Sequence, residues 1–350
     1  MKRILVLGYY GFGNFGDELI LTALQDELSE VDCEAVFAVK RPEQYENPLC
    51  TRHVFANRCD RACMRSAFRS CDTVMLGGGG LVQDVTSWRS SLYYLGIPLM
   101  GGLCGKTLIA YAQGVGPVQR LFTSHLVRTV FSRMSLIDVR DTESRELLRA
   151  CGLRNSTIHV SCDLGLTYLA TLNNPISHET HREPVILACI NPRFGWSAEQ
   201  TADFLDCLAS HYDARIELAV LFPATDEAFT REVQERLLSP AELILTPNPP
   251  ELVRRCHRAT LTVAGRYHMA IVGAATGSPL VALAYDQKIT HLAAAFGFRV
   301  IYHDTAAATA ARSVLLGQSA LPSTCKPPDL ISLRRNRIER LRHTLSCSGT

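Results

Sequence analysis

Short apolar segments alternate with amphipathic segments along most of the chain, and this alternation limits the possible folds more than any other feature. Residues 3–8 (RILVLG) are typical of a buried strand, whereas residues 17–30 (DELILTALQDELSE) place leucines at helical spacing. Apolar strands joined by helical crossovers predict parallel sheets whose two faces are both covered by helices.

The alternation stops once and then starts again. Residues 173–184 (NNPISHETHREP) are polar, contain proline and lack periodicity, which predicts a linker. The sequence therefore predicts an N-terminal Rossmann-like domain at 1–172, a second one at 185–325, and a basic helix with a tail at 326–350. The predicted fold class is α/β, with two doubly wound Rossmann-like domains that face each other across a cleft. Open sheets of this kind bind ligands at the carboxyl ends of their strands.

Composition argues against several classes of protein. The chain has 36 basic and 34 acidic residues, and this balance is not that of a dedicated nucleic-acid-binding protein. No uncharged apolar stretch approaches the ~20 residues that span a membrane. The 13 cysteines are scattered, which predicts reduced thiols in the cytoplasm. Cys59 and Cys63, with His53 nearby, are the only hint of a metal site, and we predict no bound metal.

Residues 11–16 (GFGNFG) satisfy the pattern G-x-G-x-x-G of dinucleotide-binding loops. Two features nevertheless differ from such a loop. Bulky Phe12 and Phe15 lie inside the pattern, and Asp17 falls where the next helix is predicted to begin. A carboxylate at that position favours the helix but would repel a diphosphate.

Three interpretations of this glycine loop remain open. Lys40 and Arg41 follow the second predicted strand, where they could pair with the extra phosphate of NADP. The glycines could also form a purely structural tight turn. The interpretation that we favour is an acceptor-binding loop lined by Asn14 and Asp17, because carboxamide and carboxylate groups suit sugar hydroxyls.

Further polar residues follow other predicted strands of the first domain, and they extend this acceptor side. Their side chains are compatible with hydroxyl groups. The predicted acceptor-binding set is Asn14, Asp17, Gln83, Asp84, Gln113 and Arg140. An alternative for Asp84 and Asp141 is that they cap the helices that follow them.

A different chemistry follows the predicted strands of the second domain. Arg193 comes after the first of these strands. Arg266 and His268 lie at a later strand-to-helix junction, and Lys288 follows the next strand. Because the carboxyl ends of parallel strands share one edge of a sheet, these side chains are expected to converge there. Three cations and a histidine suit a small, highly charged anion.

Six segments, taken together and in this order, make the chain resemble the polysaccharide pyruvyl transferase family, in particular its bacterial CsaB-type enzymes. They are GYYGFGNFGDELIL, GGGGLVQDVTSWRSSLYYL, YAQGVGPV, VRDTES, GRYHMAI and SPLVALAYDQKI. The resemblance implies a glycosyltransferase-B-like fold. It also implies transfer of a pyruvyl group from phosphoenolpyruvate to two hydroxyls of one sugar, as a cyclic ketal, with release of phosphate and without a cofactor. The implied acceptor is a cell-wall or surface polysaccharide, or its lipid-linked precursor.

The resemblance also implies roles for the cations of the second domain. The family's donor site uses an arginine after the first strand and an Arg-x-His motif, which match Arg193 and the pair Arg266 and His268. Lys288 matches a lysine after the next strand. His268 is then either the general acid that protonates the donor's methylene carbon or a cation that holds its phosphate. The catalytic base would be Asp17 or, as an alternative, Asp84.

Two other classes of function stay open. A glycosyltransferase of the same fold could use these cations to bind the diphosphate of a nucleotide sugar, with Asp286 at the ribose. The chain could instead be a sugar-binding module without activity, or an NADP-dependent oxidoreductase.

Residues 330–345 (LISLRRNRIERLRHTL) carry five arginines, with Leu333, Ile338, Leu341 and Leu345 roughly on one helical face. One interpretation is a closing helix that packs this face against the body of the protein and leaves its arginines solvated. The other is that its basic face contacts anionic lipid at the inner face of the membrane. The sequence predicts no particular oligomeric state.

Overall fold

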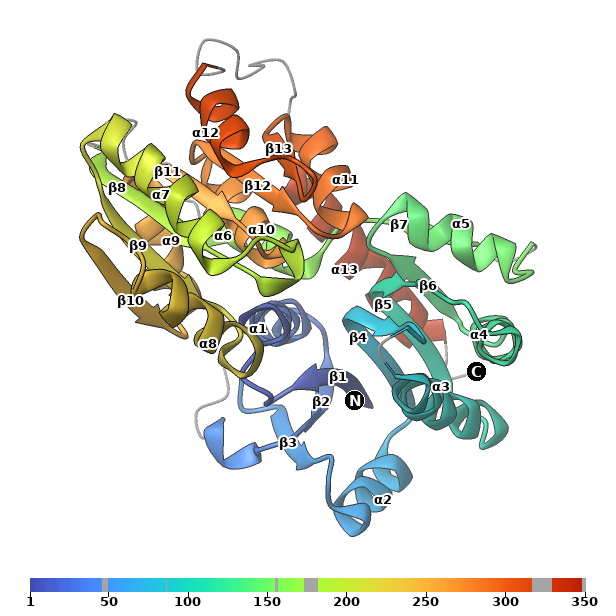
Figure 1. The fold of residues 1–350 in the computed structure, drawn as a ribbon. Coiled ribbons are helices and arrows are strands. Elements are labelled where there is room, and N and C mark those ends of the chain that lie inside the picture. Colours follow the sequence, from blue (N-terminus) through green and yellow to red (C-terminus); the bar gives the residue numbers. More distant parts are fainter. Residues whose placement is uncertain (46–49, 86, 155–156, 173–181, 317–328, 348–350) are drawn as a thin grey trace. The chain divides into compact units, whose positions relative to one another are not determined.

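The computed structural model describes residues 1–45, 50–85, 87–154, 157–172, 182–316 and 329–347 (Figure 1). The chain forms two compact units. Unit 1 comprises Met1–Phe12, Asp17–Tyr168 and Leu330–Thr350, and unit 2 comprises Gly13–Gly16 and Leu169–Asp329. Most of the predicted linker, 173–184, lies outside the described residues.

Unit 1 is built on a seven-stranded parallel sheet with the order β3-β2-β1-β4-β5-β6-β7. The strands are β1 (Lys2–Tyr10), β2 (Cys33–Val39), β3 (His53–Asn57), β4 (Thr73–Val82), β5 (Thr107–Val115), β6 (Leu136–Val139) and β7 (His159–Val160). The order reverses between β1 and β4. Sheets of this type bind ligands at such a reversal, at the carboxyl ends of the strands.

Helices cover both faces of this sheet (Figure 1). They are α1 (Phe15–Ser29), α2 (Arg61–Ser70), α3 (Trp88–Leu103), α4 (Leu121–Phe131), α5 (Thr142–Ala150), α6 (Leu164–Leu172) and α13 (Leu330–Cys347), with a 3-10 turn, η1 (Pro42–Gln44). One buried core joins the sheet to α1 and α13, through residues such as Leu24 and Leu341. A second core lies under α2 to α5, through residues such as Leu95 and Val127.

Unit 2 repeats the design with six parallel strands in the order β10-β9-β8-β11-β12-β13. They are β8 (Glu183–Cys189), β9 (Arg215–Val220), β10 (Ala241–Leu245), β11 (Ala259–Ala264), β12 (Leu280–Ala284) and β13 (Arg299–Tyr302). The covering helices are α7 (Ala198–Tyr212), α8 (Pro223–Gln234), α9 (Pro249–Arg258), α10 (Tyr267–Thr276), α11 (Gln287–Phe296) and α12 (Ala307–Leu316), with a 3-10 turn, η2 (Pro192–Phe194). The prediction of two doubly wound Rossmann-like domains is therefore confirmed for each unit.

Local sequence explains where several helices begin. Ser197 and Gln200 form a capping box at the start of α7, in which each side chain satisfies a backbone N–H group. Asp141 accepts a hydrogen bond from the N–H of Ser144 at 2.7 Å and caps α5. The interpretation of Asp141 as a helix cap is thus confirmed.

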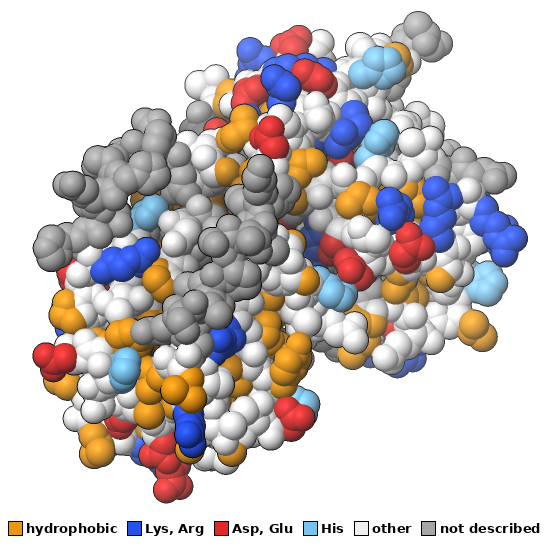
Figure 2. All heavy atoms as spheres, turned by 90° about the horizontal axis from the view of Figure 1, so that it is seen from above, with side chains coloured by type: hydrophobic (Ala, Val, Ile, Leu, Met, Phe, Trp, Pro, Cys, Tyr) orange, Lys and Arg blue, Asp and Glu red, His pale blue; other side chains and the backbone are white. Residues whose placement is uncertain are grey.

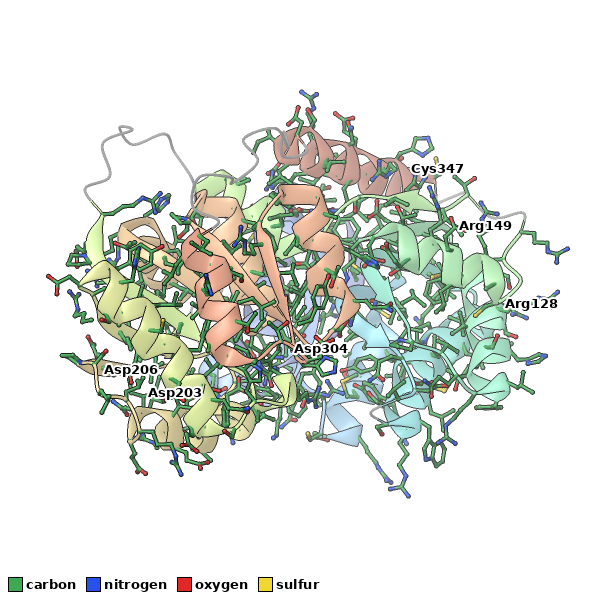
Figure 3. The ribbon with its side chains drawn as sticks, turned by 45° about the horizontal axis from the view of Figure 1, so that its top comes forward. Arg128, Arg149, Asp203, Asp206, Asp304 and Cys347 are labelled. Carbon is green, nitrogen blue, oxygen red and sulfur yellow. The ribbon has the colours of Figure 1, made fainter. Side chains whose placement is uncertain are left out.

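The C-terminal helix α13 belongs to unit 1 and buries the apolar face that the sequence predicted (Figure 3 labels its last residue, Cys347). Ile338, Leu341 and Leu345 all lie in the core that contains α1. The packing interpretation of this helix is confirmed in this respect.

The expectation that the arginines of α13 are solvated is wrong for Arg337, whereas Arg335 is exposed as expected. Arg337 has no exposed surface, and its guanidinium pairs with Glu27 of α1, which is 1 % exposed. A buried charge is tolerated only when a partner and hydrogen bonds compensate its lost hydration, and Glu27 provides this. Three further arginines of the helix pair with carboxylates, namely Arg334, Arg340 and Arg342. Contact with anionic lipid stays a prediction. It depends on the positive charge of these arginines, and carboxylates of the protein already neutralise most of that charge.

Among the described residues, no helix combines the length and apolar character that a membrane crossing requires. On the face shown in Figure 2, basic and acidic side chains are interspersed over the described surface. This distribution agrees with the near balance of 36 basic and 34 acidic residues.

Candidate active site

The four predicted donor-binding residues follow the carboxyl ends of three neighbouring strands of unit 2. Arg193 lies in η2, shortly after β8, and is exposed. Arg266 is the residue before α10, and His268 lies in the first turn of that helix, after β11. Lys288 lies in the first turn of α11, after β12. Since β8, β11 and β12 are adjacent in the sheet, these residues share one edge, at the point where the strand order reverses.

Arg266 is held by a carboxylate that the sequence did not single out. Its Nε donates to Asp226 Oδ2 at 2.8 Å, and its Nη2 donates to Asp226 Oδ1 and to Thr225 Oγ1. Asp226 lies in the first turn of α8 and is 1 % exposed. Burial alone would lower the pKa of Arg266, but Asp226 raises it above the ordinary value, so the guanidinium stays charged. The pair therefore fixes the guanidinium by one edge.

The other edge of Arg266 has no hydrogen-bond partner among the described residues. Within the described part of the chain, Nη1 makes no hydrogen bond, and the side chain keeps 16 % of its surface exposed. Arg193 acts in the same region, because both arginines lower the pKa of Tyr285 while burial and Asp286 raise it. The positive potential of both guanidinium groups thus reaches one partly buried phenol, that of Tyr285.

Asp286 has a local role at the start of α11. Its carboxylate accepts the N–H of Lys288 at 3.0 Å and lies 3.7 Å from Lys288 Nζ. It therefore caps the helix and orients the lysine. The ribose contact that the nucleotide-sugar alternative assigned to Asp286 stays a prediction.

The glycine loop uses its backbone N–H groups within the protein. Gly11 donates to Glu18 at 2.8 Å, Phe15 donates to the carbonyl of Leu221 at 2.9 Å, and Gly16 donates to Asn14 at 3.2 Å. A dinucleotide-binding loop needs such N–H groups for the pyrophosphate. This arrangement therefore gives the dinucleotide interpretation no support.

Two positions of the loop require glycine, each for a different structural reason. Gly11 has a φ of +80°, a conformation that favours glycine. Gly16 gives room to His268, because a Cβ at Gly16 would lie 1.9 Å from His268 Nδ1. The loop thus fixes the space available to the imidazole.

Three of the predicted acceptor-binding side chains in unit 1 are buried among protein partners. Gln113 is fully buried, and its Nε2 donates to the carbonyls of Gly79 and Gly114 at 2.7 and 2.8 Å. The side chain of Arg140 is 4 % exposed and pairs with Asp141 and Asp163. The bonds of Gln113 join β5 to β4, and those of Arg140 hold the chain just after β6. Contact with an acceptor stays a prediction for both residues.

Asp84 is the third buried side chain, at 4 % exposure. It accepts the N–H groups of Gln119 and Arg120, at 2.9 Å each, just before α4. Burial would raise the pKa of Asp84, but these hydrogen bonds hold it below the ordinary value. The carboxylate therefore anchors the start of α4, and its alternative role as a base stays a prediction.

Three predicted residues are more accessible. Asp17 is partly exposed in the first turn of α1, and its charge raises the pKa of Tyr9 and Tyr10, after the larger effect of burial. Asn14 and Gln83 are also partly exposed, and Gln83 Oε1 accepts the N–H of Val85 at 3.0 Å. Asp17 follows β1, at the reversal of the strand order in unit 1.

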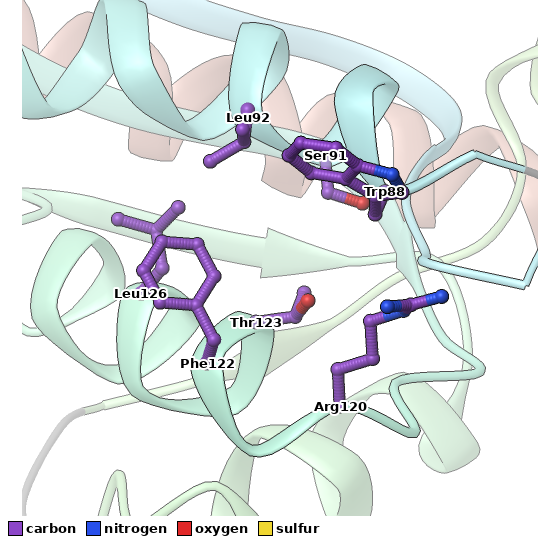
Figure 4. Close-up of a pocket in the computed structure, with 7 residues that line it drawn as sticks. All are labelled: Trp88, Ser91, Leu92, Arg120, Phe122, Thr123 and Leu126. Atoms are coloured by element: carbon purple, nitrogen blue, oxygen red, sulfur yellow. The ribbon is translucent and has the colours of Figure 1, made fainter.

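A shallow cavity of about 180 Å³ lies between α3 and α4 of unit 1 (Figure 4). It is mainly apolar, and the exposed side chains of Trp88 and Phe122 line it. Arg120, whose N–H group Asp84 holds, lines the same cavity.

No metal site is visible in the described ranges, where no three His, Cys, Asp or Glu side chains gather with the geometry for an ion. Every described cysteine, including Cys59 and Cys63, is a free thiol. His53 packs its ring edge-on against Phe37.

The fold is that of glycosyltransferase-B-like sugar enzymes. Solved structures with a similar fold include the UDP-GlcNAc 2-epimerase from Neisseria meningitidis bound to UDP-GlcNAc, with a TM-score of 0.65, 11 % identity, and coverage of 97 % of this chain and 99 % of that chain. The UDP-GlcNAc 2-epimerase of Methanocaldococcus jannaschii in complex with UDP-GlcNAc and UDP gives a TM-score of 0.62 at 12 % identity, covering 98 % of this chain and 100 % of that chain. Anabaena Alr3699/HepE in complex with UDP and glucose gives 0.57 at 11 % identity, with 100 % of both chains covered.

The sequence identifies the family within this fold class. The model of the family described as polysaccharide pyruvyl transferase matches residues 14–287. The protein therefore belongs to the polysaccharide pyruvyl transferase family, and it is a transferase. No curated protein matches the chain. The CsaB-type subgroup stays a prediction.

Proposed function

We propose that the protein transfers a pyruvyl group from phosphoenolpyruvate to two hydroxyls of one sugar, forming a ketal. The observation that carries this proposal is the set of cations after β8, β11 and β12 in a chain of this family, with Arg266 held by Asp226 so that Nη1 is left for an anion. Bidentate and charge-assisted contacts suit the carboxylate and phosphate of the donor. The acceptor is a cell-wall or surface polysaccharide or its lipid-linked precursor, modified at the cytoplasmic face of the membrane by a CsaB-type enzyme.

The chemistry of this reaction needs acid, base and charge stabilisation. A proton is added to the methylene carbon of the donor, and one sugar hydroxyl attacks the cationic C2. The second hydroxyl displaces phosphate and closes the ring. One hydroxyl proton ends on the new methyl group and the other on the phosphate, so the step balances without a redox cofactor. We assign the acid to His268 and the base to Asp17. Arg193, Arg266 and Lys288 stabilise the departing phosphate.

The central test is whether phosphate is released from phosphoenolpyruvate. The purified protein is expected to release it only when a suitable glycan is present, and the pyruvylated sugar is expected in equal amount by mass spectrometry. A parallel assay replaces phosphoenolpyruvate with UDP-sugars and uses the same acceptors. Turnover of UDP-sugars, together with no reaction of phosphoenolpyruvate over a broad acceptor panel, would contradict the proposal in favour of a glycosyltransferase.

A second expectation concerns the space around His268. Gly16→Ala is expected to lower kcat at least about tenfold, because the added methyl group would occupy the position of the imidazole. Overpacking of this kind also costs about 1 to 3 kcal/mol of stability. Gly96→Ala in α3 is the matched control, since a Cβ there meets no atom within 4 Å. A normal kcat in Gly16→Ala would show either that His268 takes no part in the reaction or that the glycine loop does not lie against it.

A further inference from the structure

Five side chains gather at the carboxyl ends of β1, β2 and β3 in unit 1, and we call them the aromatic–cation cluster: Tyr9, Phe12, Lys40, Arg58 and Tyr93. Tyr9 and Phe12 stack with their ring centroids 4.0 Å apart. Lys40 Nζ lies 4.6 Å from the centroid of the Phe12 ring. Arg58 Cζ lies 4.6 Å from the centroid of the Tyr93 ring and 5.2 Å from that of Phe12. The three strands are neighbours in the sheet, so Lys40 and Arg58, which directly follow β2 and β3, meet at one edge.

These two cations differ in their partners from three arginines described above. Arg140, Arg266 and Arg337 each pair with a carboxylate. In the described part of the chain, neither Lys40 nor Arg58 forms an ion pair. Arg58 Nη1 donates to the carbonyl of Gly8 and to the hydroxyl of Tyr94, at 2.8 and 2.9 Å, which leaves Nε and Nη2 available.

A purely structural cation–π cluster would not explain two further observations. The hydroxyl of Tyr93 is buried and has no hydrogen-bond partner among the described residues, which is costly unless a ligand supplies one. The cluster also lies within electrostatic reach of Asp17. Burial and Asp17 raise the pKa of Tyr9 while Arg58 lowers it, so the phenol is within electrostatic reach of both charges.

We propose that the aromatic–cation cluster binds a phosphate ester attached to the acceptor sugar, with the phosphate at Lys40 and Arg58 and the sugar ring against the partly exposed rings of Tyr9 and Phe12. Two cations without a carboxylate partner suit an anion, and the neighbouring rings suit an apolar face of a pyranose. This inference rests on the proposed function, because only that function identifies the bound sugar as the acceptor. It adds that the acceptor is anionic before pyruvyl transfer.

The test measures binding to the full chain by calorimetry, with no phosphoenolpyruvate present, so that it stays readable if pyruvyl transfer fails. The probes are a panel of hexose 1-phosphates, the free hexoses, inorganic phosphate and geranyl diphosphate. A hexose 1-phosphate is expected to bind at least tenfold more tightly than its free hexose or inorganic phosphate. Tighter binding of geranyl diphosphate would identify a lipid carrier as the source of the phosphate.

Matched variants locate the binding. Lys40→Met, which keeps most of the side-chain length, is expected to weaken binding of the preferred phosphate probe about tenfold or more. Arg58→Met is expected to do the same, and Lys40→Met carries the test if Arg58→Met fails to fold. Arg65→Met on the exposed surface of α2 is expected to bind as wild type. Lys288→Met at the predicted donor site is expected to lose less binding than Lys40→Met. The proposal is overturned if wild type binds no sugar phosphate or diphosphate, if inorganic phosphate binds equally well, or if Lys288→Met loses binding that Lys40→Met retains.

Discussion

Arg337→Met is expected to lower the free energy of unfolding by about 3 to 5 kcal/mol, the largest stability effect that we predict. The guanidinium has no exposed surface, and its Nε donates to Glu27 at 3.1 Å. It also donates to the hydroxyl of Thr167 at 2.7 Å and to the carbonyl of Cys162 at 3.1 Å. Methionine fills much of the volume but leaves Glu27 as a buried charge whose main partner is gone.

Urea unfolding of the full chain measures this loss. Arg335→Met is the matched control, because Arg335 lies on the same helix but is exposed, and a change within about 0.5 kcal/mol is expected there. The double variant Glu27→Gln, Arg337→Met removes both charges and is expected to recover part of the loss. A single variant Arg337→Met as stable as the control would show that the pair does not hold α13 on unit 1.

The helix α13 illustrates what the sequence could predict. The spacing of Ile338, Leu341 and Leu345 is local, and it correctly predicted the buried face. The burial of Arg337 depends on Glu27, which lies 310 residues earlier, and no local pattern connects the two. Five arginines in one helix were therefore interpreted as solvated, although the fold provides carboxylates for most of them.

The polar residues at strand ends show the same limit. The alternation of segments correctly predicted that Arg140 follows a buried strand, because that depends only on strand position. The prediction that Gln113 follows a strand is wrong, because β5 (Thr107–Val115) continues past it. The alternation could not predict whether these side chains face a ligand or the backbone of a neighbouring loop. Gln113 bonds to Gly79, 34 residues away, and Arg140 pairs with Asp163, 23 residues away. Such partners depend on the order of strands in the sheet, which the sequence does not state.

The aromatic–cation cluster was missed for a related reason. From the sequence, Lys40 is only a possible phosphate ligand of NADP, and no local pattern points to Arg58. Their convergence depends on β1, β2 and β3 lying side by side, which places Phe12 beside both cations. A strand order of 3-2-1 is common in such sheets, so inspection of every cation that directly follows one of these strands would have found the pair.

Arg266→Lys is expected to raise the KM for phosphoenolpyruvate by about 10- to 100-fold, the largest kinetic effect on the donor that we predict. This corresponds to the loss of about 1.5 to 3 kcal/mol from one charge-assisted contact. Lysine keeps the positive charge that Asp226 needs, but it lacks the planar fork that lets arginine bind Asp226 with one edge and an anion with the other. The fold is therefore expected to survive while donor binding weakens.

The choice of lysine follows from the structure. Arg266→Ala would leave Asp226 buried at 1 % exposure with its main partner removed, so lost activity in that variant would not separate binding from stability. Asp226→Asn is the complementary variant, because it keeps the shape and removes the charge that orients Arg266. Asp226→Asn is expected to raise the KM for the donor less than Arg266→Lys does, since the guanidinium itself remains.

Steady-state kinetics at varied phosphoenolpyruvate, with the melting temperature of each variant as the check on folding, measure these effects. Arg258→Lys is the matched control, because Arg258 pairs with Glu183 and Glu217 at the end of α9 and follows no strand of the predicted donor site. Wild-type KM in Arg266→Lys, with a folded protein, would contradict the placement of Arg266 in the donor site. A KM raised equally in Arg266→Lys and Arg258→Lys would contradict it as well, because a general loss of positive charge density would then explain both. A KM raised only in Arg266→Lys and Asp226→Asn would support the conclusion that the pair of Asp226 and Arg266 positions the donor.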